Sequence, residues 1–191
     1  MAFTKKLYYR EKFVKTVLTE ERIQARVFEE CEFNNCSFTG CKFESCKFLN
    51  CKFNECDLSS VIPMGCHFTD VRFLRCKAIG IDWTKAQKMR DISFIECLIN
   101  YSNFTLLKLP KLKMIKCEAK EVTFIETDLS DGDFKSTDFE KSTFFKTDLT
   151  NADFGKAINY FIDIKTNTLK KTHFSLPEAM SLLNALDIII D

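Results

Sequence analysis

The chain has 191 residues, with 28 lysines and arginines against 27 aspartates and glutamates, and its formal net charge is +1. This length permits one domain with a sizeable core, and the near-neutral charge argues against a protein that works chiefly by global attraction to nucleic acid or to an anionic membrane. The sequence contains neither an apolar stretch of the signal-peptide type near its start nor a run of about 18 apolar residues that could span a membrane, so we expect a cytoplasmic protein.

A large apolar residue recurs at every fifth position, and we call this position the centre of a repeat. The centres keep one frame from Phe3 to Trp83, and all phenylalanines except Phe145 and Phe161 fall in the frame once a single slip is allowed. A period of five matches neither an α-helix nor a regular strand. It predicts a coil that turns a corner every five residues.

Residues 1–25 keep the centres but lose the second feature of the repeat, a small residue two positions before each centre. The charged side chains of Lys6, Glu11 and Glu21 stand there instead. We therefore expect an irregular first coil.

The ten cysteines all lie two positions before a centre. Extended chain places residues two apart on the same face, so each thiol is predicted to point inward beside a large centre. The spacing lacks the C-x₂-C pairs of zinc sites, and thiols on one face are about one rung apart, which suits a disulfide poorly. We expect free, buried thiols that behave as small hydrophobic residues, which also favours a reducing cytosol.

The frame slips by one residue between Trp83 and Phe94, which are eleven residues apart where ten would keep the frame. The segment in the slip, residues 84–93, is basic and lacks apolar periodicity, so we expect a short outward loop and Trp83 as a core centre. After the slip the centres continue to Phe154 and, less cleanly, through Ile164, Leu169 and Phe174.

The repeats TDLSD, GDFKS, TDFEK, TDLTN and ADFGK resemble the pentapeptide-repeat family. Membership implies an all-β fold, a right-handed quadrilateral β-helix over residues 1–174 with four repeats to each coil. Residues twenty apart should then stack on one face, and two rows of centres fit: Leu109, Leu129, Leu149 and Leu169, and Phe94, Met114, Phe134, Phe154 and Phe174. Stacked rungs contact mainly their neighbours, so the ends of the rod need capping.

A short C-terminal α-helix is predicted within residues 175–191. Ser175 and Glu178 have the spacing of a capping box, and Pro177 suits the first helical turn. An apolar stripe at helical spacing follows. Because this surface exceeds what one coil end needs, we expect a homodimer through residues 176–190, with the candidate interface Leu176, Met180, Leu182, Leu183, Leu186 and Ile188.

No catalytic, metal or cofactor site is indicated. The two histidines, His67 and His173, lie more than a hundred residues apart, and neither a G-x-x-x-x-G-K-[ST] nor a G-x-G-x-x-G motif is present. A cysteine nucleophile would need an exposed thiol. We expect a protein that is not an enzyme and uses no cofactor.

Charge is unevenly distributed along the chain. Residues 71–116 hold ten lysines or arginines against three acidic residues, and residues 117–155 hold ten acidic residues against four lysines. Many of the aspartates occupy the family's Asp/Asn slot and could simply bond to backbone at corners. Alternatively, stacked carboxylates could imitate DNA phosphates, and the candidate acidic surface is Glu118, Glu121, Glu126, Asp128, Asp133, Asp138, Asp148 and Asp153.

The stretch CKAIGIDW and the tail from Asn159 are similar to the group that protects DNA gyrase, the quinolone-resistance and microcin-immunity type. That resemblance implies a dimer joined through the C-terminal helix and DNA mimicry toward gyrase. The net charge and the lack of long projecting loops differ from that group. Two hypotheses remain open, a DNA mimic that binds gyrase or another topoisomerase and a scaffold or interaction module for another protein. Direct nucleic-acid binding through the basic segment 71–116 is the least favoured, and no membrane partner is expected.

Overall fold

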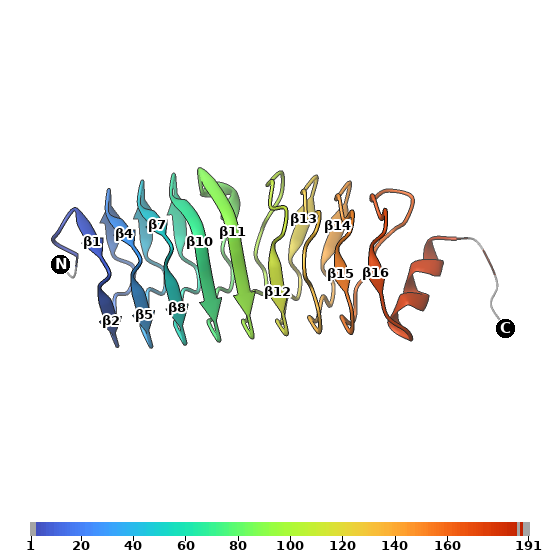
Figure 1. Cartoon of the computed structure of the whole chain (residues 1–191), viewed down its shortest axis with the longest axis horizontal. Coiled ribbons are helices and arrows are strands. Elements are labelled where there is room, and N and C mark those ends of the chain that lie inside the picture. Colours follow the sequence, from blue (N-terminus) through green and yellow to red (C-terminus); the bar gives the residue numbers. More distant parts are fainter. Residues whose placement is uncertain (1–2, 187, 189–191) are drawn as a thin grey trace.

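The computed structural model describes residues 3–186 and 188, and it is a right-handed quadrilateral β-helix of about eight turns that ends in a short helix (Figure 1). Strand partners are parallel and, except at the frame slip, twenty residues apart, as where Leu7 aligns with Val27. Main-chain groups bond to the next turn, for example from the N–H of Arg10 to the carbonyl oxygen of Glu29 at 2.9 Å. No helix in this part of the chain has the length and apolar character needed to cross a membrane.

The rod has four faces, which we number in chain order. Face 1 contains a short 3-10 helix, η1 (Trp83–Lys85), and five strands: β3 (Arg22–Gln24), β6 (Lys42–Glu44), β9 (Ile62–Met64), β13 (Thr123–Ile125) and β14 (Thr143–Phe145). Face 2 contains β1 (Leu7–Tyr9), β4 (Val27–Glu29) and β7 (Lys47–Leu49). Face 3 contains β2 (Lys12–Val14), β5 (Glu32–Asn34), β8 (Lys52–Asn54), β12 (Lys113–Ile115), β15 (Asp153–Phe154) and β16 (His173–Phe174).

Two longer strands, β10 (His67–Leu74) and β11 (Lys88–Ile95), run around the corner from face 2 to face 3 and join the two faces in one sheet (Figure 1). Face 4 is formed by isolated parallel bridges in place of strands, in the column Val17, Ser37, Asp57, Lys77, Leu98, Glu118, Asp138 and Ile158. A positive φ recurs at the corners, where outward side chains such as Glu126 and Asp131 have φ of 52° and 56°.

The core consists of the predicted centres stacked in columns. The ring of Phe48 lies parallel to Phe28 and to Phe68, with centroids 5.1 and 5.0 Å away. All ten cysteines are buried and free, as predicted, while Phe145 and Phe161, the two outside the frame, are 40% and 61% exposed. The two predicted rows of centres also stack, since Lys108 pairs with Asp128 on face 2 and Lys113 with Asp133 on face 3.

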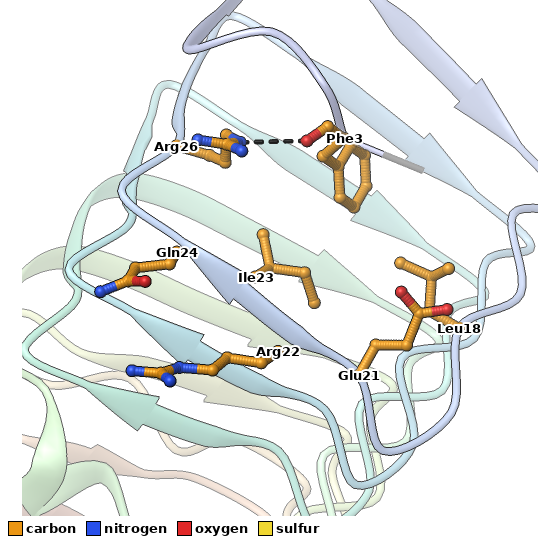
Figure 2. A pocket seen from close by; sticks show the side chains of 7 residues that line it. All are labelled: Phe3, Leu18, Glu21, Arg22, Ile23, Gln24 and Arg26. Atoms are coloured by element: carbon orange, nitrogen blue, oxygen red, sulfur yellow. Dashed lines mark hydrogen bonds between the residues drawn. The ribbon is translucent and has the colours of Figure 1, made fainter. Parts of the chain in front are cut away.

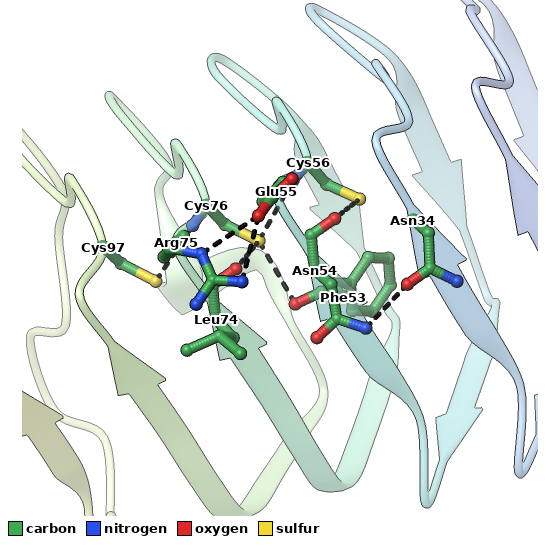
Figure 3. A network of polar contacts seen from close by, with 9 residues as sticks. All are labelled: Asn34, Phe53, Asn54, Glu55, Cys56, Leu74, Arg75, Cys76 and Cys97. Atoms are coloured by element: carbon green, nitrogen blue, oxygen red, sulfur yellow. Dashed lines mark hydrogen bonds and ion pairs between the residues drawn. The ribbon is translucent and has the colours of Figure 1, made fainter.

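The buried thiols also form hydrogen bonds, which their interpretation as small hydrophobic residues did not include. The Sγ of Cys76 donates to the carbonyl oxygens of Phe53 and Leu74 at 3.3 and 3.4 Å, and it accepts from the N–H of Cys56 at 3.4 Å (Figure 3). Arg75 and Glu55 pair on the outer surface of the same turns at 2.9 Å. The thiol at the small inward position therefore links consecutive turns through hydrogen bonds to their main chain.

The first coil is regular, contrary to the expectation for residues 1–25. Strands β1, β2 and β3 pair in register with the next turn. Lys6 and Glu21 are exposed, but their carbonyl oxygens accept the usual bonds from Val27 and Lys42 at 2.9 Å. The charged side chains point away from the core at the open end, so they leave the backbone undisturbed.

Phe3 closes this end of the rod. It is buried, and its ring centroid lies 5.0 Å from that of Phe28 in an edge-to-face arrangement. Arg26 reaches back to donate to the carbonyl oxygen of Phe3 at 3.0 Å (Figure 2). One aromatic side chain thus covers the first turn.

The predicted outward loop over residues 84–93 is wrong. At the frame slip the chain forms the short helical turn η1 and then enters strand β11. The turn η1 holds Thr84 and Lys85, and the carbonyl oxygen of Cys66 then accepts from both Gln87 and Lys88 at 2.9 and 3.3 Å. That shared acceptor absorbs the extra residue, and β10 and β11 pair twenty-one residues apart. Met89 and Ile92 in β11 are buried, because Met89 aligns with the centre Phe68 and Ile92 with the inward Val71 of the preceding turn.

The last coil departs from the frame. Ile164, the predicted centre, is only half-buried, whereas Ile162 pairs with Phe144 and is buried. Tyr160 also enters the core, with its ring 5.5 Å from Phe174. The polar residue Asn159 stands where a centre belongs, so the chain shifts to bury the nearby aromatic and aliphatic residues instead.

The terminal helix η2 (Glu178–Ala185) is a 3-10 helix and not the predicted α-helix. The capping box does not form, because both of its side chains bond to the preceding turn. Ser175 Oγ accepts from the N–H of Lys156 at 2.7 Å, and Glu178 Oε1 accepts from the N–H of Asn159 at 2.5 Å. These bonds dock the start of η2 on the last coil (Figure 1).

Candidate charged interaction surface

The aspartates before the centres bond to the backbone of their own corners. Asp128 Oδ1 accepts from the N–H of Ser130 at 3.0 Å, and Asp148 Oδ1 accepts from that of Thr150 at 2.9 Å. Asp138, Asp153 and Asp133 make the same contact two residues on. Part of the aspartate pattern therefore has a structural cause, since the short side chain closes an Asx turn.

The candidate acidic surface does not form a single patch. The bridge columns place Asp128 and Asp148 on face 2, Asp133 and Asp153 on face 3, and Glu118 and Asp138 on face 4, opposite face 2. Glu121 and Glu126 occupy corners on either side of face 1. The set surrounds the rod because successive repeats turn onto successive faces.

Lysines on adjacent turns neutralise several of these carboxylates. Lys120 lies 3.5 Å from Asp138, Lys146 lies 3.3 Å from Glu126, and Lys135 lies 3.0 Å from Asp153. Glu118 accepts a hydrogen bond from Asn100. Asp138, Glu126 and Asp153 are therefore poor candidates for attraction of a partner, because a lysine compensates the charge of each, whereas the neutral amide of Asn100 leaves the charge of Glu118 in place.

Asp153 has the most strongly perturbed carboxyl group of the surface. Partial burial acts to raise its pKa, but hydrogen bonds from His173 and Lys135 and from the N–H of Gly155 outweigh this effect and lower the pKa to about 2. The His173 Nδ1 atom lies 2.9 Å from Asp153 Oδ1. This carboxylate belongs to a local network that holds β15 against β16.

Three aspartates on one side of the rod have no cation within 4.0 Å among residues 3–186: Asp128, Asp131 and Asp148. We call them the acidic patch. Asp131 is exposed at the corner between faces 2 and 3 and accepts from Asn151 Nδ2 at 3.0 Å. It is absent from the candidate acidic surface, although it holds the same repeat position as Glu121 and Glu126, and the turn geometry places it beside Asp128.

The candidate dimer residues divide into a half-buried group and an exposed group. Leu182 is half-buried and packs against the core at the end of the rod. Leu176, Met180 and Ile188 are 77%, 44% and 55% exposed. Leu183 and Leu186 are half-buried, and residues 187, 189 and 190 of the predicted interface lie outside the described residues. One helix therefore caps the last coil and still presents apolar surface.

The geometry defines a class of protein, a β-solenoid whose inward positions serve packing and whose outward positions carry the variable chemistry. The chain belongs to the pentapeptide-repeat family: the family model of the pentapeptide repeat region matches residues 27–104, and that of pentapeptide repeats in eight copies matches residues 120–158.

Solved structures show the same fold. Two trypsin-treated variants of QnrB1, a plasmid-mediated fluoroquinolone resistance protein, are similar to this chain with TM-scores of 0.68 and 0.66 at 20% and 21% identity. The matches cover 97% of this chain and 99% and 97% of those chains. No curated protein matches the chain by sequence.

Proposed function

We propose that this protein acts by binding another macromolecule, and that its partner is DNA gyrase or a related topoisomerase, which it meets as an imitation of DNA. The acidic patch is the observation that carries this proposal. Asp128 and Asp148 stand on consecutive rungs of one column, about 4.8 Å apart by strand spacing, and Asp131 lies beside them at the corner. Regularly spaced, uncompensated carboxylates on a straight rod are the charge pattern that a DNA-binding groove attracts.

The similarity to the fluoroquinolone resistance protein concerns the fold, and it supports the proposal as a choice of partner to test first. A fold does not carry a function by itself. Supercoiling by purified gyrase, measured with and without a fluoroquinolone over a range of added protein, is the direct assay. The expected result is a concentration-dependent change in supercoiling or protection from the drug.

The decisive variant combines Asp128→Asn, Asp131→Asn and Asp148→Asn. An amide oxygen can still accept the corner hydrogen bonds, so the fold should be preserved while three charges are removed. The matched control is Asp57→Asn, Asp82→Asn and Asp163→Asn, because these aspartates also close turns within their own repeats. Loss of the gyrase effect in the first variant alone supports the proposal. An effect retained in that variant, or absent from the unaltered protein, refutes it.

We further propose that the protein works as a homodimer through η2. The support is the exposed pair Leu176 and Met180 next to Leu182, which already covers the end of the rod. An isologous contact would bury the exposed group of both chains at once, and two-fold symmetry is the commonest closed arrangement. The two acidic patches would then lie near the middle of a longer rod.

A different protein partner is the second candidate, and a separate observation favours it. Face 1 of the C-terminal turns has no charged side chain in β13 or β14. Exposed apolar residues flank or occupy it: Tyr101, Leu106, Phe145 and Phe161. Exposed aromatic and aliphatic groups mark protein contact surfaces. Substitution of Phe145 and Phe161 by serine should abolish partner binding in this case and leave any gyrase effect intact.

A further inference from the structure

A basic zone covers one side of the rod, and we infer that it binds the phosphate backbone of a nucleic acid that crosses the rod. The zone occupies faces 2 and 3 over four consecutive turns, from β7 and β8 to β12. Its cations are Lys47, Lys52, Arg72, Lys88, Arg90, Lys108, Lys111 and Lys113, and the anions on the same stretch are Asp70 and Asp91.

The cations lie in columns because the turns stack in register. Lys47, His67 and Lys88 align on face 2, while Lys52, Arg72, Ser93 and Lys113 align on face 3. At a strand spacing of about 4.8 Å, four turns extend over about 14 Å of the rod. Lys47 and Lys52 lie outside the basic segment 71–116, and the stacking of turns brings them into the same surface.

Grooves run along the corner between the two faces. One of about 360 Å³ is lined by Arg72, Ser93, Lys111 and Lys113 together with Asp70 and Asp91. The next, of about 300 Å³, is lined by the donors Asn50, Lys52 and Arg72 and by the carboxylates Glu30 and Asp70. Lysine, arginine, serine and asparagine side chains are typical donors to phosphate oxygens. The grooves therefore offer several donors to a phosphate chain on adjacent rungs.

Five lysines of the basic zone have no carboxylate within 4.0 Å among residues 3–186: Lys47, Lys88, Lys108, Lys111 and Lys113. The two carboxylates within the zone are each near an arginine, Asp70 at 3.8 Å from Arg72 and Asp91 at 3.1 Å from Arg90. The lysines are free to displace counterions from phosphates, which is the main source of non-specific affinity for nucleic acid.

A nucleic acid fits this zone better than an acidic protein. Among the described residues, no exposed large apolar side chain stands within faces 2 and 3 of these four turns, and the nearest, Leu106, lies at the edge with face 1 beside Lys88 and Lys108. Protein interfaces depend on an apolar centre with aromatic or aliphatic anchors. A surface that offers charge and hydrogen-bond donors alone suits a backbone of regularly spaced phosphates.

Acidic turns border the basic zone at both ends and determine the orientation of the ligand. Glu29, Glu30 and Glu32 occupy the turn before it, and Asp128, Asp131 and Asp133 occupy the turn after it. A duplex parallel to the rod would meet these carboxylates, whereas one that crosses the rod would not. Cations spread over about 14 Å can contact phosphates on both sides of a minor groove about 6 Å wide.

The test is fluorescence anisotropy with labelled 12-bp and 24-bp mixed-sequence DNA duplexes over a series of salt concentrations. Five free lysines predict a slope of log affinity against log salt of about −4.5. Because the duplex crosses the rod, the 24-bp probe should give the same slope per bound protein as the 12-bp probe. A slope near zero, or one that grows in proportion to duplex length, overturns the inference.

The variant is Lys108→Glu, Lys111→Glu and Lys113→Glu, for which affinity should fall at least tenfold and the slope by about three. The matched control is Lys141→Glu, Lys156→Glu and Lys165→Glu, exposed lysines of the C-terminal turns with the same change in net charge, and it should bind as the unaltered protein does. Equal losses in the two variants would show a global charge effect and refute the site. Competition by polyglutamate as strong as that by unlabelled DNA would assign the zone to acidic proteins and also refute it.

Discussion

The main-chain N–H of Cys76 donates to the Sγ of Cys97 on the next turn at 3.3 Å. Two rungs further in the same column is Thr137, whose Oγ1 accepts from the N–H of Cys117 at 3.1 Å and donates to the carbonyl oxygen of Met114 at 2.6 Å. A thiol and a hydroxyl thus serve the same purpose in one column. At these rungs the inward side chain both fits and hydrogen-bonds, whereas Ala157 on the last rung of the column only fits.

Replacement of Cys97 by threonine or by valine should separate these two requirements, because the two residues have the same shape. Threonine can keep the bonds to Cys76 and to the carbonyl oxygen of Phe73, whereas valine leaves a buried N–H without its partner. We expect Cys97→Val to be less stable than Cys97→Thr by about 1–2 kcal/mol. Urea unfolding under reducing conditions measures the difference, and equal stabilities would mean that the thiol bonds contribute nothing.

Phe48→Ala should destabilise the rod by about 3–5 kcal/mol. The ring is buried and stacked between Phe28 and Phe68, so truncation leaves a cavity that its neighbours on both sides cannot close. Phe161→Ala is the matched control, since this ring is 61% exposed and outside the frame. The control should stay within about 0.5 kcal/mol of the unaltered protein, and a comparable loss in both would contradict the burial argument.

The native protein should resist thiol reagents. All ten thiols are buried, which keeps reagents away from them. For Cys31, Cys41 and Cys51, burial also raises the pKa, to about 12 for Cys51, so these three form little reactive thiolate at pH 8. We expect at most two of the ten cysteines to react within minutes without denaturant and all of them to react in its presence. Fast reaction of more thiols in the folded state would contradict the inward assignment.

Acid should weaken the contact between the last two turns through Asp153. Its folded pKa of about 2 lies below the ordinary value of 3.8, so the carboxylate contributes stability above about pH 4 that is lost as the pH falls toward 2. Asp153→Asn should therefore be less stable than the unaltered protein at pH 7, and the difference should shrink as the pH falls from 5 to 2. Lys135→Met should remove part of this pH dependence, and a difference that does not vary with pH would exclude the charge interaction.

Leu176→Asp combined with Met180→Asp should convert the proposed dimer to a monomer with no loss of fold, because both side chains are exposed. Leu182→Asp should instead destabilise the end of the rod, since this residue packs on the core. Sedimentation equilibrium at micromolar concentration measures the mass, and circular dichroism checks the fold. A mass near 22.2 kDa for the unaltered protein would leave η2 as a cap alone.

The sequence by itself determined which side chains point inward, because a five-residue period of large apolar residues has no other way to be buried. It therefore predicted the buried thiols, the buried phenylalanines of the frame and Trp83 as a core centre, and it set Phe145 and Phe161 outside the frame. It also located the frame slip, since one extra residue shifts every later centre. The family resemblance then supplied the four faces.

Only the tertiary structure decided which charges share a side and how the irregular segments are accommodated. Asp138 follows Asp128 closely in sequence but lies on the opposite face, whereas Lys47 joins Lys88 because whole turns return to the same column. The extra residue at the slip became a tight turn because one carbonyl oxygen could accept two N–H groups. Ser175 and Glu178 bonded to the previous turn because its main-chain donors were within reach, a contact between segments that local helix signals do not contain.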